Sequence, residues 1–261
     1  MKTLIALLVA AVALPLGANA SADRASGTLD VNSVVSMGYR LSRNVCPPGM
    51  PATTEDCVLF TGGRAAIPGL GRGTVTYLKS FDQTICPGQV VGQKTSVFDI
   101  RGKGQITVAM DFLCANPAPN FTVTRGTVVA GTGVFAGASG SLQIASMVNS
   151  PTCGGSGCIG GGEDMWTGSL VIPGREFDLT PPAFQPVVSK RVKAPRKAKT
   201  VRVRYAPQAQ DAVDGPMPVT CKPASGSRFK VGRTTRVSCS AEDTSANLAT
   251  TSFSVKVTRR R

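Results

Sequence analysis

The residues of this chain that could do chemistry are eight cysteines, a scatter of carboxylates and many lysines and arginines, while histidine is absent. Without histidine there is no Ser-His-Asp or Cys-His nucleophile. The adjacent acidic pairs Glu55-Asp56, Glu163-Asp164 and Glu242-Asp243 would point to opposite faces of a strand, so none forms an obvious two-carboxylate site. We therefore predict a protein that is not an enzyme, with no catalytic residue, cofactor or resident metal.

The sequence contains three weaker signals for chemistry. Distant carboxylates such as Asp111 and Glu163 could still form a glycosidase site. Asp211 and Asp214 could hold calcium, although a plain turn explains them better. The glycine-rich run 154–162 lacks the Gly-Lys-Ser/Thr ending of a phosphate-binding loop, and we expect a flexible loop there.

The cysteines favour disulfides. All eight lie after residue 20, and an even number in an oxidising compartment predicts four bridges. Their connectivity does not follow from the sequence alone, and our prediction is nearest-neighbour pairing: Cys46–Cys57, Cys86–Cys114, Cys153–Cys158 and Cys221–Cys239. Zinc bound by Cys153 and Cys158 is the alternative, which their four-residue spacing and the absence of histidine disfavour.

The first 20 residues predict a secretory signal peptide. Lys2 supplies the positive end, residues 4–16 the apolar core, and Ala18-Asn-Ala20 the small-residue cleavage site. The apolar core is shorter than the ~20 residues that span a membrane, and no later stretch reaches that length. We expect an exported, extracellular chain without a transmembrane segment.

Basic residues are concentrated in the last part of the chain. Residues 21–185 hold 11 Lys and Arg against 11 Asp and Glu, whereas residues 186–261 hold 17 against 4. This asymmetry predicts an acidic partner, and a solubilising face is the alternative. The predicted binding residues are the cations of the densest run and of the stretch after it: Lys190, Arg191, Lys193, Arg196, Lys197, Lys199, Arg202 and Arg204.

The expected partner is an anionic glycan, a cell-wall polymer or another extracellular polyanion. Specific nucleic-acid binding is not expected, because Tyr205 is the only aromatic residue near the basic run and stacking platforms need several. The oligomeric state does not follow from the sequence.

The hydrophobic pattern indicates β-structure throughout. Between residues 27 and 173, short strands separated by Gly and Pro turns are typical of a barrel or sandwich. The predicted strands are Thr28–Met37, Gly73–Tyr77, Lys94–Ile100, Gly104–Leu113, Phe121–Ala130, Ser141–Val148 and Trp166–Ile172. From Val219 to Val257, apolar residues alternate with basic and polar ones, which predicts a small antiparallel sandwich.

This C-terminal part resembles a hyalin-repeat (HYR) domain. The resemblance covers roughly residues 181–258 and rests on three phrases: Tyr205-Ala-Pro-Gln-Ala-Gln-Asp-Ala-Val-Asp-Gly-Pro-Met-Pro-Val-Thr-Cys221, then Pro223 to Cys239, then Ser252-Phe-Ser-Val-Lys-Val257. A frequent third cysteine is Thr251 here, and the usual Gly-Asn turn is Ala246-Asn247. The resemblance implies an immunoglobulin-like sandwich of extracellular proteins, associated with adhesion and without known catalytic residues.

The phrase from Gly126 to Leu142 is similar to a glycine-rich corner of small secreted barrels of the allene oxide cyclase and dirigent type. It contains Gly131-Thr-Gly-Val-Phe-Ala-Gly-Ala-Ser-Gly140, with Phe135 as an expected buried anchor between glycines. The resemblance implies a fold only, because no active-site residue of those families aligns with this chain.

These observations predict an all-β protein with an N-terminal β-barrel or sandwich and a C-terminal immunoglobulin-like β-sandwich. The expected boundaries are a signal peptide at 1–20, a barrel-like domain at 21–173, a Pro-rich and then basic connector at 174–200 that includes the first strand region of the next domain, an HYR-like domain at 181–258 and a basic tail at 259–261.

The first functional hypothesis is a secreted binding or adhesion protein whose basic module attaches to an anionic extracellular surface. The alternative is a small-ligand-binding or enzymatic barrel with the module as a targeting domain, which a cavity lined by polar groups would favour. A purely structural exported protein is the third.

Overall fold

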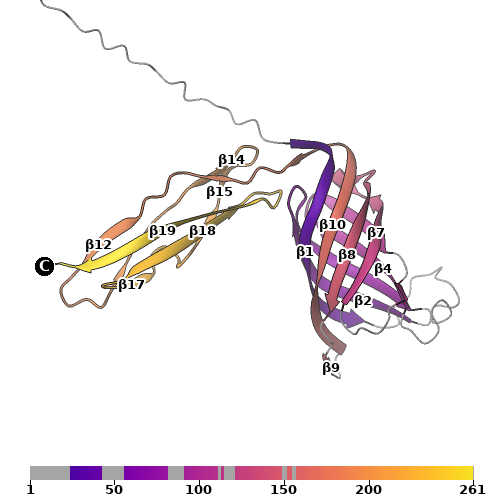
Figure 1. Ribbon diagram of the computed structural model, residues 1–261, viewed down its shortest axis with the longest axis horizontal. Coiled ribbons are helices and arrows are strands. Elements are labelled where there is room, and N and C mark those ends of the chain that lie inside the picture. Colours follow the sequence, from indigo (N-terminus) through magenta and orange to yellow (C-terminus); the bar gives the residue numbers. More distant parts are fainter. Residues whose placement is uncertain are drawn as a thin grey trace, which may run out of the picture.

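The protein is almost entirely β-structure (Figure 1), as predicted. The computed structural model describes residues 24–42, 56–81, 91–110, 113–114, 121–148, 152–154 and 157–260. The predicted signal peptide and the last residue of the predicted basic tail lie outside these ranges. In the described part of the chain, no helix is long and apolar enough to span a membrane.

The N-terminal half is a closed barrel, which decides between the two architectures that the sequence allowed. Eight strands pair in the order β1-β2-β3-β4-β5-β7-β8-β10, and β10 pairs back onto β1. They are β1 (Arg24–Ser42), β2 (Asp56–Ile67), β3 (Gly71–Phe81), β4 (Val91–Ile100), β5 (Gly104–Met110), β7 (Phe121–Gly131), β8 (Ser139–Val148) and β10 (Gly157–Asp178). The short strands β6 (Leu113–Cys114) and β9 (Thr152–Gly154) pair with β4 and β10.

Side chains that alternate along the strands fill the barrel. On β5, Ile106, Val108 and Met110 are buried while the residues between them are partly exposed. The largest buried side chains, Trp166 and Tyr77, lie far apart in the sequence and pack in the same core. Period-two alternation therefore places one face of each strand inside.

The glycine-rich corner after β7 is built around Phe135, as predicted. This residue ends the short 3-10 helix η1 (Gly133–Phe135) and is fully buried. A Cβ atom on Gly131 would lie only 1.8 Å from the carbonyl oxygen of Phe135. Glycine is required there because the backbone of the corner folds directly over the strand end.

Two predictions for the barrel were wrong. Strand β2 was not predicted, and residues 157–162 were predicted as a loop but begin β10. The second prediction was wrong because the glycines of residues 154–162 were interpreted as a loop signal. In β2, a Cβ on Gly63 would lie 2.8 Å from the carbonyl oxygen of Val75, so a tight strand contact requires this glycine.

The C-terminal half is a β-sandwich made of short strands. Its sheets are β12-β19-β18-β16, β11-β14-β15 and β13-β17. The strands are β11 (Ala183–Phe184), β12 (Lys190–Ala194), β13 (Thr200–Arg202), β14 (Ala209–Asp211), β15 (Gly215–Met217), β16 (Val219–Lys222), β17 (Arg228–Lys230), β18 (Thr234–Glu242) and β19 (Leu248–Arg259). Phe229 of β17 packs in one core with Val237, Phe253 and Val255 of the larger sheet.

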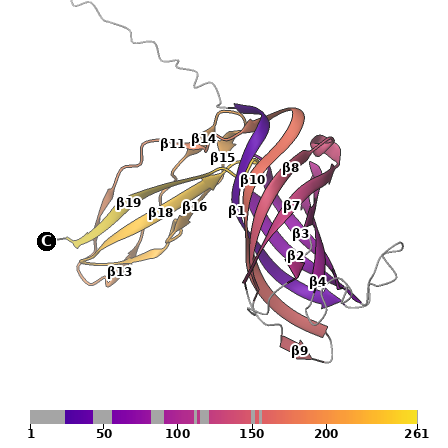
Figure 2. The same ribbon diagram turned by 45° about the vertical axis from the view of Figure 1, so that its right-hand side comes forward.

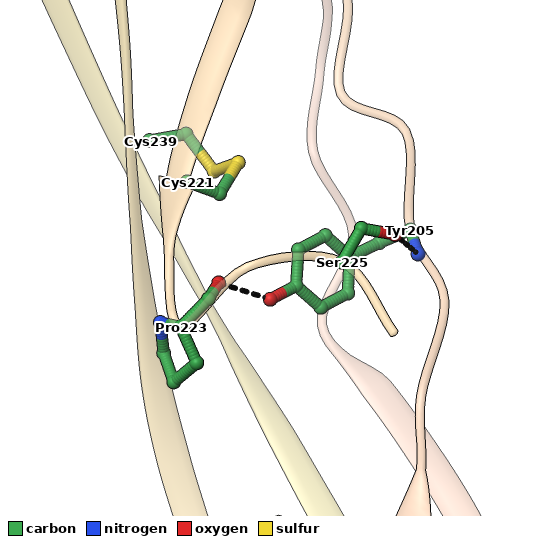
Figure 3. The surroundings of a disulfide bond; sticks show 5 residues. All are labelled: Tyr205, Cys221, Pro223, Ser225 and Cys239. Carbon is green, nitrogen blue, oxygen red and sulfur yellow. Dashed lines mark hydrogen bonds between the residues drawn. A yellow bond between two sulfur atoms is a disulfide. The ribbon is translucent and has the colours of Figure 1, made fainter. Parts of the chain in front are cut away.

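Tyr205 ties the two sides of this sandwich together (Figure 3). Its ring packs edge-on against Phe253 at 5.1 Å and Phe229 at 6.4 Å between ring centroids. Its hydroxyl donates to the carbonyl oxygen of Pro223, and its amide donates to the Ser225 hydroxyl. One side chain thus fills the core and satisfies polar groups at the edge of the sandwich.

The predicted bridge between Cys221 and Cys239 is present (Figure 3). These residues lie opposite each other on β16 and β18. The backbones of Cys153 and Cys158 are also directly opposed, on β9 and β10, while their side chains lie outside the described part. The other two predicted bridges include Cys46 and Cys86, which lie outside it as well.

The sandwich contacts the barrel with one end only (Figures 1 and 2). The β14–β15 hairpin and the β18–β19 turn lie at the barrel, and the C-terminal end of β19 lies farthest from it. The Gly69 amide donates to the carbonyl of Ser245 at 2.8 Å, and Arg72 forms an ion pair with Glu242. We call this contact region the junction.

We expect loss of the Cys221–Cys239 bridge to destabilise the sandwich without affecting the barrel. The bridge closes a loop with a sequence separation of 18, for which chain entropy gives ~3 kcal/mol. In the C221A/C239A variant, hydrogen exchange of β16 and β18 amides should accelerate by roughly a hundredfold. The urea transition followed by the fluorescence of Trp166, the single and barrel-buried tryptophan, should stay in place. Unchanged exchange in β16 and β18 would contradict this account.

Candidate functional site

Three segments meet at the end of the sandwich that lies away from the barrel. The turn after β12, the β17–β18 turn and the end of β19 are joined by backbone hydrogen bonds. The Val231 amide donates to the carbonyl of Lys199 at 3.0 Å, and the Arg260 amide donates to that of Ala194 at 3.0 Å. These segments carry seven exposed cations, which we call the cationic tip: Arg196, Lys197, Lys199, Lys230, Arg233, Arg259 and Arg260.

No acidic side chain belongs to the described part of this tip. The four carboxylates of residues 186–261 all lie at the opposite end, at the junction. Glu242 pairs with Arg72 of the barrel, and Asp214 accepts hydrogen bonds from the amide and hydroxyl of Thr244, both at 2.8 Å. The sandwich is therefore electrically polar along its length, with its carboxylates at one end and exposed cations at the other.

The eight predicted binding residues are divided between the tip and the strands beside it. Arg196, Lys197 and Lys199 belong to the tip. The others flank it: Lys190, Arg191 and Lys193 on β12, Arg202 on β13 and Arg204 just after β13, all exposed.

The flanking residues lie on two faces. β12 and β13 belong to different sheets whose inner sides share one core. Outward side chains of β12, such as Arg191, therefore point away from those of β13, such as Arg202. The Lys190 ammonium bridges the two strands by donating to the carbonyl of Arg204 at 2.9 Å. One flat partner could reach the tip together with one flank, but not both flanks.

The predicted set omitted cations that the fold brings to the tip. Lys230 and Arg233 lie more than thirty residues from the basic run in sequence, and the Val231–Lys199 backbone bond places them beside it. The signal available in the sequence was the alternation of Arg228, Phe229 and Lys230, which predicts two outward cations beside an inward phenylalanine.

A groove lies elsewhere on the sandwich. Its volume is about 640 Å³, and its walls include Tyr205, Gln208, Met217, Thr220 and Ser225. None of the residues that line it is charged. The groove therefore does not complement a polyanion, whereas the tip does.

Apolar side chains pack in the described interior of the barrel and leave a small void between them. A void lined by Phe98, Val108, Leu142, Trp166 and other apolar residues has a volume of only about 10 Å³. A cavity needs about 10–15 Å³ of such volume to hold one water molecule, so this void is too small for an organic ligand. This void does not provide the cavity that would favour a ligand-binding barrel.

One buried carboxylate does lie inside the barrel. Asp164 is fully buried, and the Trp166 indole donates to its Oδ2 at 3.5 Å. Burial raises the pKa of the Tyr77 hydroxyl, and the charge of Asp164 and a hydrogen bond to it raise that pKa further. Glu163, one member of the possible distant carboxylate pair, is exposed on the outside of the barrel, and Asp111 lies outside the described residues.

Residues 177–257 match the HYR domain family. The predicted resemblance is confirmed. HYR domains are non-enzymatic modules of extracellular and cell-surface proteins. The match spans less than a third of the chain and leaves the barrel outside it.

The barrel has a distant counterpart among solved structures. The structure of the pterocarpan synthase dirigent protein GePTS1 is 11% identical, covers 64% of this chain and 99% of its own, and has a TM-score of 0.34. It belongs to a family that the Gly126–Leu142 corner resembles, but a likeness of this extent carries no inference about function. No curated protein matches the chain.

We expect Tyr77 to titrate only when the barrel unfolds. Its raised pKa means that the neutral phenol stabilises the folded state at all pH values below the ordinary tyrosine pKa, and that this contribution is lost as the pH rises above it. In an alkaline titration followed by tyrosinate absorbance, the Y77F variant should lack the last, cooperative step of the wild-type curve. A wild-type curve in which every tyrosine ionises near pH ~10 before Trp166 fluorescence changes would contradict this.

Proposed function

We propose that this chain is a secreted, non-enzymatic binding protein whose HYR domain attaches it, through the cationic tip, to an anionic extracellular polymer or surface. The observation that carries the proposal is the charge polarity of the HYR domain: every acidic side chain of residues 186–261 lies at the junction, and the charged side chains described at the opposite end are all cations. Export is supported by the signal-like residues 1–20, the Cys221–Cys239 bridge and the extracellular occurrence of HYR domains.

The position of the tip suits attachment of the whole molecule. It lies at the far end from the barrel (Figure 2), so a bound surface would contact the HYR domain first and leave the barrel facing outward. Its cations are exposed on turns and strand ends, where long side chains can adapt to a polymer without any change in the core.

Charge is the only recognition chemistry that the tip offers. The segments that carry it, residues 195–199, 230–233 and 258–260, include no aromatic side chain on which a base or sugar ring could stack. Binding should therefore depend on the charge density of the partner and fall steeply with salt, as counterion release requires. Sulfated glycans, anionic cell-wall polymers and anionic vesicles are the partners to compare, and heparin is the practical probe for the first.

The alternative function is a small-ligand-binding barrel that the HYR domain delivers to its target. Its supporting observation is the buried Asp164 beside Tyr77 in the barrel interior. Against it stands the void of about 10 Å³, which is too small for an organic ligand.

We expect neutralisation of the tip to weaken binding to heparin. The full mature chain with R196Q, K197Q and R233Q should bind at least tenfold more weakly at low salt, and the slope of log affinity against log salt should fall by roughly two. Three lost charge contacts explain both effects. Affinity should be measured by calorimetry at several salt concentrations.

The matched control removes the same charge from the barrel. Arg64, Arg101 and Arg125 are exposed barrel residues, so the R64Q/R101Q/R125Q variant has the same net charge as the tip variant. We expect it to retain wild-type affinity within about twofold. Equal losses in both variants would mean that net charge, and not the tip, drives binding.

A further inference from the structure

Three aspartates from separate segments meet at the junction. Asp178 ends β10 of the barrel, Asp211 ends β14 and Asp243 follows β18. One carboxylate oxygen from each lies within 4.8 Å of the others. All three residues are buried, with exposed fractions of 8%, 2% and 6%. Buried carboxylates at this spacing repel one another unless a positive charge lies among them.

In two of these carboxylates, one oxygen accepts no hydrogen bond. Oδ1 of Asp178 accepts from the Thr180 amide at 3.0 Å, and Oδ1 of Asp211 accepts from the amides of Val213 and Asp214 at 2.8 and 2.9 Å. The Oδ2 atom of Asp178 and that of Asp211 are buried and have no partner. Such atoms are rare in folded proteins and often mark a missing ion or water.

Neighbouring donors are engaged elsewhere. The Lys103 ammonium donates to the carbonyl oxygens of Leu70 and Thr244 at 3.0 and 2.9 Å, although the carboxylates lie near enough to act on its charge. Arg72 pairs with Glu242. Among the described residues, no side chain supplies the cation or the donor that the two open oxygens lack.

The surrounding hydrogen bonds hold the three carboxylates in place. The Asn247 amide group donates at 2.8 Å both to the carbonyl of Asp178 and to Oδ2 of Asp243. The other oxygen of Asp243 accepts from the backbone amides of Ser245 and Asn247. Burial raises the pKa of Asp243, and the charge of Asp178 raises it further, whereas these hydrogen bonds lower it. The cluster is therefore built and fixed before any ion arrives.

We propose that Asp178, Asp211 and Asp243 bind a calcium ion that joins the barrel to the HYR domain. Calcium takes oxygen ligands at 2.3–2.6 Å, so two ligands of one ion can lie up to about 4.6–5.2 Å apart, and oxygens within 4.8 Å of one another satisfy that limit. Magnesium, at about 2.1 Å, needs a tighter and more regular shell. Zinc prefers nitrogen and sulfur ligands, which the cluster does not contain.

The ion would fix the direction in which the HYR domain leaves the barrel. Asp178 is carried by the last barrel strand, and Asp211 and Asp243 by the HYR domain, so one ion bonds to both bodies. Extracellular modules bind calcium with Kd values of roughly 10⁻⁴–10⁻³ M, which is the affinity that an exported chain would use. This goes beyond attachment by the tip and does not depend on it.

The test is calcium binding by the full mature chain, measured by calorimetry, together with thermal unfolding in calcium and in EGTA. We expect one bound ion and a rise of about 5 °C in the unfolding midpoint at 10 mM calcium, roughly 10–100 times Kd. Magnesium at the same concentration should give less than half of this rise. No binding and no shift in the wild type would overturn the proposal.

The D211N variant separates calcium binding from a structural role. Its amide keeps an Oδ1 acceptor for Val213 and Asp214 while removing one negative charge. Calcium affinity should fall at least tenfold, and in EGTA the variant should melt at or above the wild-type midpoint, because a repulsion is gone. A lower midpoint in EGTA together with an unchanged calcium response would contradict the proposal.

Two further variants complete the test. D178N also keeps its Oδ1 acceptor, and it serves if D211N does not fold; the same loss of calcium binding is expected. D30N removes an exposed carboxylate on the barrel and should respond to calcium as the wild type does. Loss of the response in D30N, or its persistence in D178N, would place the ion elsewhere.

Discussion

The ladder between β1 and β10 is the constraint on which the rest of this structure depends. It runs from the Arg24–Asp178 pair to the Leu41–Cys158 pair and closes the sheet into a barrel without free edges. Closure lets apolar side chains from all eight strands meet in one core. The same ladder also fixes Asp178, the residue at which the chain passes from the barrel to the HYR domain.

The HYR domain extends from Asp178, and its acidic and basic side chains gather at opposite ends. Its acidic groups lie at the junction, where Glu242 meets Arg72 and the aspartates cluster, and its exposed cations lie at the far end. In the proposed attachment a polyanion would contact the tip, and the barrel would shield the negative end. The charges of the last 76 residues are thus separated along the domain, which composition alone does not reveal.

Much of this fold could be predicted from the sequence, because period-two alternation and one well-defined domain phrase carry local information. The turn forms even where the sequence departs from the usual HYR pattern, because Ala246 takes the glycine position with a φ of 64°. Strand β2 escaped prediction because its glycines serve strand packing. The meeting of Asp178 with Asp211 and Asp243, and of Lys230 with the basic run, escaped because such long-range contacts depend on the tertiary fold.

Lysine footprinting of the full chain with heparin bound would test the central claim most directly. Attachment through the tip predicts that Lys197, Lys199 and Lys230 lose reactivity toward an acylating reagent, while the lysines of the barrel react as in the free protein. Protection should disappear at high salt, because screening weakens exposed charge contacts. Protection centred on the barrel, with the three tip lysines unaffected, would contradict the account.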